Sequence, residues 1–151
     1  MAGRTPSIRF VGRSAHMSDR MGEKLTDGFV ALVLEQLFAR HAPRPSFTML
    51  APDIDAAGCR YTLYMNADLP ADAIASLDQL LAANPRYAWC RRLRQLHPPR
   101  AFRVAGNAYA AYSQRLCAGG QRLGDIKPAA LSALDGWSIR FPGAYLDSHP
   151  D

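Results

Sequence analysis

Apolar residues recur with a helical period in the segment that follows Thr26. They form a broad stripe typical of a core-facing helix, which Thr26 caps and which runs to about His41. The same reasoning predicts three further helices. These cover Pro70–Ala83, the stretch from Asn84-Pro85 to about Gln95, and the stretch from the cap Asn107 to Gly119-Gly120.

Alternation of apolar and polar positions predicts short β-strands between these helices. The polar residues Asp53 and Asp55 are interpreted as turn residues between two strands, rather than as an acid–base or metal-binding pair. The expected strands are Ser7–Val11, Ser46–Pro52, Cys59–Asn66 and Pro99–Val104.

This succession of elements predicts an α+β fold, with a small mixed or antiparallel sheet and helices packed mainly on one face. A chain of 151 residues is expected to form one domain with its own core. We expect a hinge and hairpin region over residues 8–25 and an α+β body over residues 26–141. Ala129–Leu134 is expected to form a last helical turn, and residues 142–151 a loose tail.

Composition places the chain among ordinary globular proteins, with 48% hydrophobic and 21% charged residues. A net charge of +5 and a pI near 9.4 suit an anionic partner. The positive charge is dispersed, however. Its densest cluster, Arg91, Arg92 and Arg94, fits the solvated face of a helix.

The three cysteines, Cys59, Cys90 and Cys117, are widely spaced and form no CxxC motif. They are interpreted as small buried hydrophobic residues, so no metal site is expected. Met1–Ser7 lacks the apolar core of a signal peptide, and no apolar run is long enough to cross a membrane. We therefore expect a cytoplasmic protein without a membrane partner.

The segment Gly119–Leu131, with the sequence GGQRLGDIKPAAL, holds one of only two lysines among the 18 basic residues. Gly119 and Gly120 are expected to end the preceding helix in the left-handed conformation, and Pro128 biases Lys127 toward extended backbone. A lysine on such a tether presents a compact, mobile charge that suits a phosphate oxygen. Composition alone also allows an ordinary surface lysine at this position.

Three motifs, in this order along the chain, resemble one known family. The string GQRLGDIKPAAL, followed by DGW at Asp135–Trp137, resembles the C-terminal end of bacterial members of the auxin-responsive GH-three family. FVGRSAHMSDRMGEKL at Phe10–Leu25 resembles the passage from the large N-terminal domain of that family to its small C-terminal lid. Asn84–Val104 also fits, so that the resemblance spans residues 8 to 141.

The resemblance implies an adenylate-forming ligase, an acyl acid–amido synthetase. Such an enzyme uses ATP to convert a carboxylic acid to an acyl-adenylate and then forms an amide with an amino acid. ATP and Mg²⁺ would be held mostly by the large N-terminal adenylating domain, to which nothing here corresponds. The chain alone is therefore expected to be an inactive part of a ligase. An apolar patch near Gly12–Leu25 and Lys127 is expected to be exposed for that partner domain.

The resemblance also assigns roles to residues. Lys127 matches the late lysine of the family and is the expected catalytic residue. Where many adenylating enzymes carry an acidic hinge residue, this chain has Ala15-His16. Arg13 also fits an ordinary exposed arginine, and Lys24 beside Glu23 also fits a solvated hairpin. The expected nucleotide- or phosphate-binding residues are Arg13, Gly120, Gln121, Arg122 and Gly124, and the expected hinge or interface residues are Gly12, His16, Asp19, Glu23, Lys24 and Asp125.

A different class of function stays open on the sequence, namely a stand-alone binding module for a protein partner or for RNA. A basic α+β domain with aromatic residues is compatible with RNA binding. The sequence nevertheless argues against nucleic acid as a partner, because no strand carries the aromatic pattern of an RNA-recognition motif. The arginines are also not interleaved with aromatic residues in one element.

Overall fold

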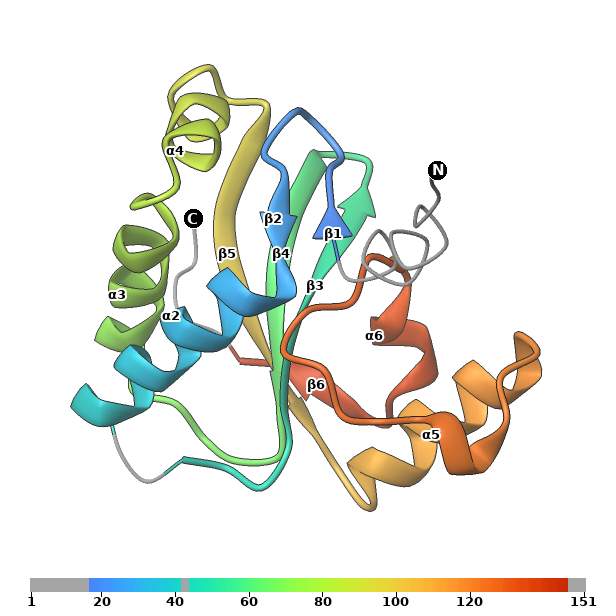
Figure 1. Cartoon of the computed structure of the whole chain (residues 1–151). Helices are drawn as coiled ribbons and strands as arrows, with labels where there is room; N and C mark the ends of the chain where they lie inside the picture. The colour runs from blue at the N-terminus through green and yellow to red at the C-terminus, as the bar shows by residue number, and fades with distance from the viewer. Residues whose placement is uncertain (1–16, 42–43, 147–151) are drawn as a thin grey trace, which may run out of the picture.

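The computed structural model describes residues 17–41 and 44–146 and is built around a four-stranded mixed sheet (Figure 1). Strands β3 and β4 are antiparallel, β4 and β5 are parallel, and β5 and β6 are antiparallel. A separate two-stranded hairpin, β1 with β2, precedes this sheet. The strands are β1 Met17–Ser18, β2 Leu25–Thr26, β3 Thr48–Asp55, β4 Gly58–Met65, β5 Leu96–Val104 and β6 Gly143–Tyr145, and the sheet order is β3-β4-β5-β6.

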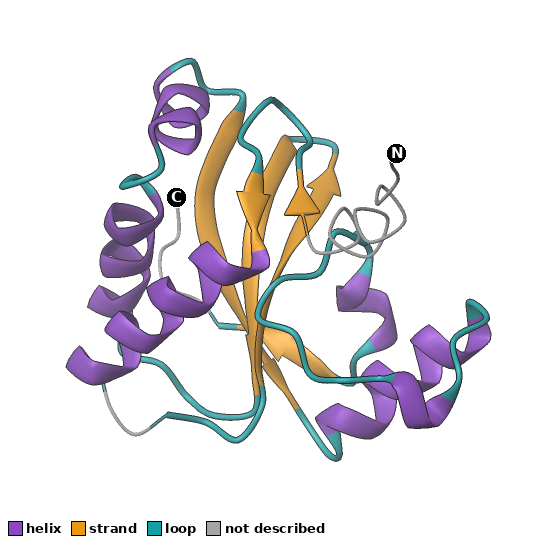
Figure 2. Ribbon diagram, in the orientation of Figure 1, coloured by secondary structure: helices purple, strands orange, loops and turns teal. Residues whose placement is uncertain are grey.

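Helices cover both faces of the four-stranded sheet. Helices α2 (Asp27–Arg40), α3 (Ala71–Leu81) and α4 (Pro85–Arg92) pack on one face, where the buried residues include Leu63 of β4. Helices α5 (Ala108–Ala118) and α6 (Trp137–Arg140) pack on the other face, with the next residue, Tyr64. Figure 2 shows α2 crossing the sheet and α5 lying beside α6, away from α2 and α3. The α+β class is confirmed, with most of the helices on one face.

The helix starts follow the local sequence closely. Thr26 Oγ1 accepts the amide of Phe29 (3.2 Å), and Asn107 Oδ1 accepts the amide of Ala110 (3.0 Å). Asn84 Oδ1 likewise caps α4, which has proline at its first position. Each cap satisfies an amide that the first helical turn leaves without a partner. Among the helices of the described ranges, none is long and apolar enough to cross a membrane.

The β3–β4 hairpin differs from the sequence prediction at Asp53. Strand β3 continues to Asp55, so that Asp53 pairs with Arg60 instead of lying in the turn. The Asp53 carboxylate is buried and accepts hydrogen bonds from the hydroxyls of Thr62 (3.1 Å) and Tyr145. These two hydroxyls compensate the loss of water around the carboxylate. Both partners come from other strands, so residue preferences in turns could not predict the burial of Asp53.

The C-terminal part is more ordered than the sequence predicts. Strand β6 and Leu146, whose amide donates to Ala101 O (2.9 Å), join the sheet, although residues 142–151 are expected to be loose. The predicted helical turn at Ala129–Leu134 is wrong. Leu131 instead forms a parallel bridge with Leu50, on the edge strand β3. The segment forms hydrogen bonds with backbone groups of this edge strand. These groups would lack that partner if the segment formed a helical turn.

Candidate functional site

The Lys127 segment starts at a glycine turn that ends α5. Gly120 has φ +108°, whereas Gly119 has φ −85°, so that only Gly120 adopts the left-handed conformation predicted for both. The amide of Gly120 donates to Cys117 O and that of Gln121 to Leu116 O, each at 3.0 Å. This is a Schellman arrangement, and it uses both amides. Any phosphate contact of Gln121 is therefore left to its side chain.

Tyrosines of α5 and an aspartate of α2 hold the backbone around Lys127. The hydroxyl of Tyr109 donates to Ile126 O (3.1 Å), and that of Tyr112 donates to Lys127 O (3.2 Å). Beyond Pro128, Asp27 Oδ1 accepts the amides of Ala130 (2.9 Å) and Leu131 (3.0 Å). The Lys127 side chain is exposed. Lys127 thus carries an exposed side chain on an anchored main chain.

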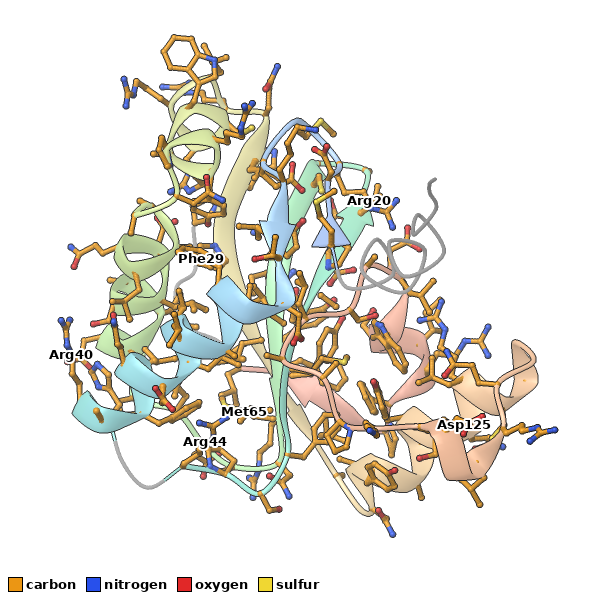
Figure 3. All side chains as sticks on the ribbon, viewed as in Figure 1. Arg20, Phe29, Arg40, Arg44, Met65 and Asp125 are labelled. Atoms are coloured by element: carbon orange, nitrogen blue, oxygen red, sulfur yellow. The ribbon has the colours of Figure 1, made fainter. Side chains whose placement is uncertain are left out.

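The other predicted residues of this segment are also exposed. A short 3-10 turn, Leu123–Asp125, contains Gly124, and the Asp125 amide donates to Arg122 O (2.9 Å). Figure 3 shows Asp125 beside α5. Arg122 and Asp125 are thus exposed on the stretch of chain that leads to the lysine.

A groove of about 660 Å³ lies next to Pro128, the residue that follows Lys127. Its lining includes Pro128 and Ala130 of the lysine segment, Tyr109 of α5, Asp27 of α2 and Arg44, which precedes β3. Figure 3 shows Arg44 on the side of the molecule where α2 ends, well away from Asp125. Arg44 is thus a cationic residue of this groove, whereas Lys127 itself does not line it.

The β1–β2 hairpin is organised around Glu23, which is fully buried. Its carboxylate accepts the amides of Arg20 (2.8 Å) and Met21 (2.6 Å) and the hydroxyl of Tyr61. Burial, and secondly the charge of Glu23, raise the pKa of Tyr61 well above its ordinary value. Ser18 Oγ lies 2.6 Å from the same hydroxyl. Glu23 thus ties the hairpin to the sheet, and its carboxylate lies in the interior.

Asp19 and Lys24 form an ion pair at the surface of the hairpin. Lys24 Nζ donates to Asp19 Oδ2 (2.9 Å), and the amide of Gly22 donates to Asp19 Oδ1 (2.8 Å). The hydrogen bond from Lys24 is the main cause that lowers the pKa of Asp19. Lys24 itself has φ +47°. Both residues thus stabilise the turn and stay accessible to a partner.

The structure joins the hairpin to the lysine segment. Arg20 Nη2 donates to Ala133 O (2.7 Å), a short distance along the chain after the segment that Asp27 holds. Figure 3 shows Arg20 above this connection, next to β1.

Gly12, Arg13 and His16 lie outside the described residues. Within residues 17–41 and 44–146, no three His, Cys, Asp or Glu side chains cluster as metal ligands would.

Residues 29–134 match the model of the GH3 family C-terminal domain. This match covers more than half of the chain. The chain belongs to the GH3 family, as a C-terminal domain. The family resemblance of its sequence motifs is thereby confirmed. No curated protein gives a significant match to the chain.

A solved structure shares this GH3 fold. It is a GH3.15 acyl acid amido synthetase, with a TM-score of 0.57 and 13% sequence identity. The similarity covers 76% of this chain but only 23% of the other, so that the chain corresponds to a small part of that enzyme's length. At this identity the likeness concerns the fold alone.

Three residues that anchor the GH3 lysine were not predicted from sequence. Tyr109 and Tyr112 stand three positions apart on α5, a spacing that places them side by side on a helix. Asp27 directly follows the Thr26 cap, where an acidic residue is explained by the helix dipole alone. The spacing of the two tyrosines could thus have indicated from sequence that they act together. The role of Asp27 can be recognised only in the folded structure.

Proposed function

We propose that this GH3 C-terminal domain is the lid of an ATP-dependent acid–amido synthetase and that Lys127 is its catalytic residue. One observation carries the proposal. The side chain of Lys127 is exposed, while Tyr112 holds its backbone carbonyl and Asp27 holds the backbone amide of Ala130 that follows it. Family membership supports the assignment to a ligase. The fold it shares with an acyl acid amido synthetase agrees with it.

The chemistry explains why a lysine is needed. In the first half-reaction the carboxylate of an acyl acid attacks the α-phosphate of ATP, so that two anions must approach each other. Negative charge then builds on the phosphoryl oxygens. The ammonium group of Lys127, donating hydrogen bonds to these oxygens, offsets the repulsion as the lid closes. Because the main chain of Lys127 is anchored, its ammonium group has less conformational freedom to lose in the transition state.

The remaining polar residues of the segment have supporting roles in this proposal. Arg122 and the side chain of Gln121 contact phosphate oxygens beside Lys127, with Arg13 approaching from the hinge and Gly124 keeping the turn narrow. Asp125 and the Asp19–Lys24 ion pair face the large domain. Mg²⁺, held mostly by that domain together with ATP, supplies neutralising charge on the phosphates.

We further propose an N-terminal adenylating domain as the partner and the cytoplasm as the compartment. Three large apolar side chains of the hairpin and α4 support the partner: Met21, Trp89 and Leu93 are 43%, 54% and 49% exposed around a groove of about 670 Å³. Leu123, close to Lys127, is 65% exposed. Such surface is typical of an interaction face. The free thiols of the chain fit a reducing compartment.

The test is pyrophosphate release from ATP by this chain combined with, or fused to, its cognate large domain, with a panel of carboxylic acids. We expect activity only with both parts and a loss of about 10²–10³-fold in Lys127→Gln. Arg40→Gln, at the exposed end of α2, is the charge-matched control and should keep full activity.

Lys127→Gln should leave the fold intact, because the main-chain carbonyl of Lys127 makes the contact with Tyr112. The melting temperature of the variant should therefore equal that of the parent. Full activity in Lys127→Gln would disprove the role of the lysine. Absence of pyrophosphate release from the intact pair, with every acid, would disprove the ligase assignment.

A further inference from the structure

A third concave site lies at the far end of α5, between this helix and α6. It has a volume of about 460 Å³ and is lined by Arg115, Gln121 and Arg140, with Leu116 and Leu134 as apolar walls. We call it the arginine pocket. Lys127 is not among its lining residues, and the groove beside Lys127 lies at the opposite, N-terminal end of α5. Of the residues that line this pocket, the function proposed above uses only Gln121.

Arg115 is held in the pocket by an aromatic ring. Its guanidinium carbon lies 4.4 Å from the centroid of the Trp137 ring, and Trp137 is fully buried. Trp137 is itself fixed, because its indole N–H donates to Ser132 Oγ (3.0 Å) and its ring stacks on Tyr112 and Phe141. The direction of the Arg115 side chain is thus set before any ligand arrives.

The Arg115 guanidinium lacks acceptors in the described part of the chain. Its Nη1 atom is inaccessible to solvent and has no hydrogen-bond partner there. A buried donor without an acceptor costs about 1–3 kcal/mol, and more when it is charged. Because Nη1 is closed to solvent, an oxyanion in the pocket would be held by the rest of this guanidinium, since Arg115 as a whole is part-exposed and lines the pocket.

Arg140 adds a second positive charge. Within residues 17–41 and 44–146, neither Arg115 nor Arg140 forms an ion pair, and the pocket lining includes no carboxylate. Burial, followed by the charge of Arg140, lowers the pKa of Arg115, while the charge of Asp135 acts in the opposite sense. An anion between the two arginines would relieve their repulsion.

We propose that the arginine pocket binds the phosphate group of a small phosphorylated molecule. Two guanidinium groups match the double negative charge of a phosphate monoester better than the single charge of a carboxylate, and guanidinium binds such oxygens in pairs. Leu116 and Leu134 offer apolar contact to the body of the ligand, for which the pocket volume leaves room.

Tryptophan fluorescence of the 151-residue chain measures this binding directly, because Trp137 contacts Arg115. Trp89→Phe removes the other tryptophan, which is exposed. In that background, inorganic phosphate should change the emission saturably at constant ionic strength. Arg140→Gln should weaken binding about tenfold or more, as the loss of one charge-assisted contact implies. Arg40→Gln, with the same change in net charge, should bind as the parent does.

Two further probes decide the chemistry of the ligand. Acetate should bind more weakly than phosphate, whereas glycerol phosphate should bind at least as tightly if the pocket serves a phosphorylated molecule rather than free phosphate. Equal weakening in Arg140→Gln and Arg40→Gln would show a general charge effect and overturn the proposal. The proposal would also be overturned if acetate bound as tightly as phosphate, or if the emission did not saturate as phosphate is added.

Discussion

The hydroxyl of Tyr112 donates a hydrogen bond to the backbone carbonyl of Lys127 over 3.2 Å. This contact ties the one exposed lysine of the C-terminal segment to a helix on the second face of the sheet. Tyr112 also stacks on Trp137, with ring centroids 5.5 Å apart and an angle of 22° between the planes. The position of Lys127 therefore depends on the aromatic core beneath it.

Tyr112→Phe tests this dependence, because it removes the hydroxyl and keeps the stacking ring. We expect a loss of about 0.5–1.5 kcal/mol in the free energy of unfolding. Hydrogen exchange should become faster in residues 119–131. Tyr109→Phe is the matched variant, since its hydroxyl holds the neighbouring carbonyl of Ile126. Unchanged exchange in both variants would show that other contacts fix the segment.

Glu23 and Tyr61 should act as a unit in the hairpin. Glu23→Gln replaces an acceptor of three hydrogen bonds with a side chain that has only one acceptor oxygen, and we expect a loss of about 1–3 kcal/mol in the free energy of unfolding. Urea denaturation of both single variants and of Glu23→Gln/Tyr61→Phe gives the coupling energy. Strictly additive losses would contradict the direct interaction.

Gly143 should be required in β6. Its φ is +143°, and a Cβ there would collide with the backbone carbonyl of Arg103 in the neighbouring strand. Gly143→Ala should therefore detach β6 and lower the free energy of unfolding by about 1–3 kcal/mol. Gly106→Ala is the control, because Gly106 also has positive φ but open space around it. Equal losses in the two variants would remove the steric argument.

Stability should fall steeply at alkaline pH. Burial is the main cause that raises the pKa of Tyr61, Tyr64 and Tyr87 above the ordinary value of 10.0. Above pH 10.0 the unfolded chain therefore loses protons that the folded chain keeps, so that the free energy of unfolding decreases as pH rises. Tyrosine absorbance should report these ionisations together with unfolding.

Tyr87→Phe gives a control for the alkaline effect. Its hydroxyl donates to Asp78 (2.8 Å), and its ring is buried beside α3. The variant should show a shallower decrease of stability above pH 10.0, because one buried phenol is gone. An identical slope in parent and variant would mean that Tyr87 ionises freely in the folded state.

Local features of the chain could be predicted from the sequence because each depends on near neighbours. The caps Thr26, Asn84 and Asn107 act on amides two or three residues away. The glycine turn after α5 follows the same logic at Gly120. Three motifs, in their order along the chain, were enough to predict the GH3 family, which the family match confirms.

Other features were decided only when distant segments met. Asp53 is a strand residue because Thr62 and Tyr145 supply donors from two other strands. Cys117 was predicted to be buried, and the two other cysteines are, but it lies exposed near the end of α5. A residue's own neighbours along the chain say little about such burial.

The sequence by itself determined the helix starts, the α+β class and the family to which the lysine segment belongs. The tertiary structure decided how that segment lies, through Tyr112 and Asp27, and brought Arg115 and Arg140 to one pocket. The physical reason is the range of the interactions. Caps and periodicity act over one or two helical turns, whereas these contacts join residues that only the packed sheet brings together.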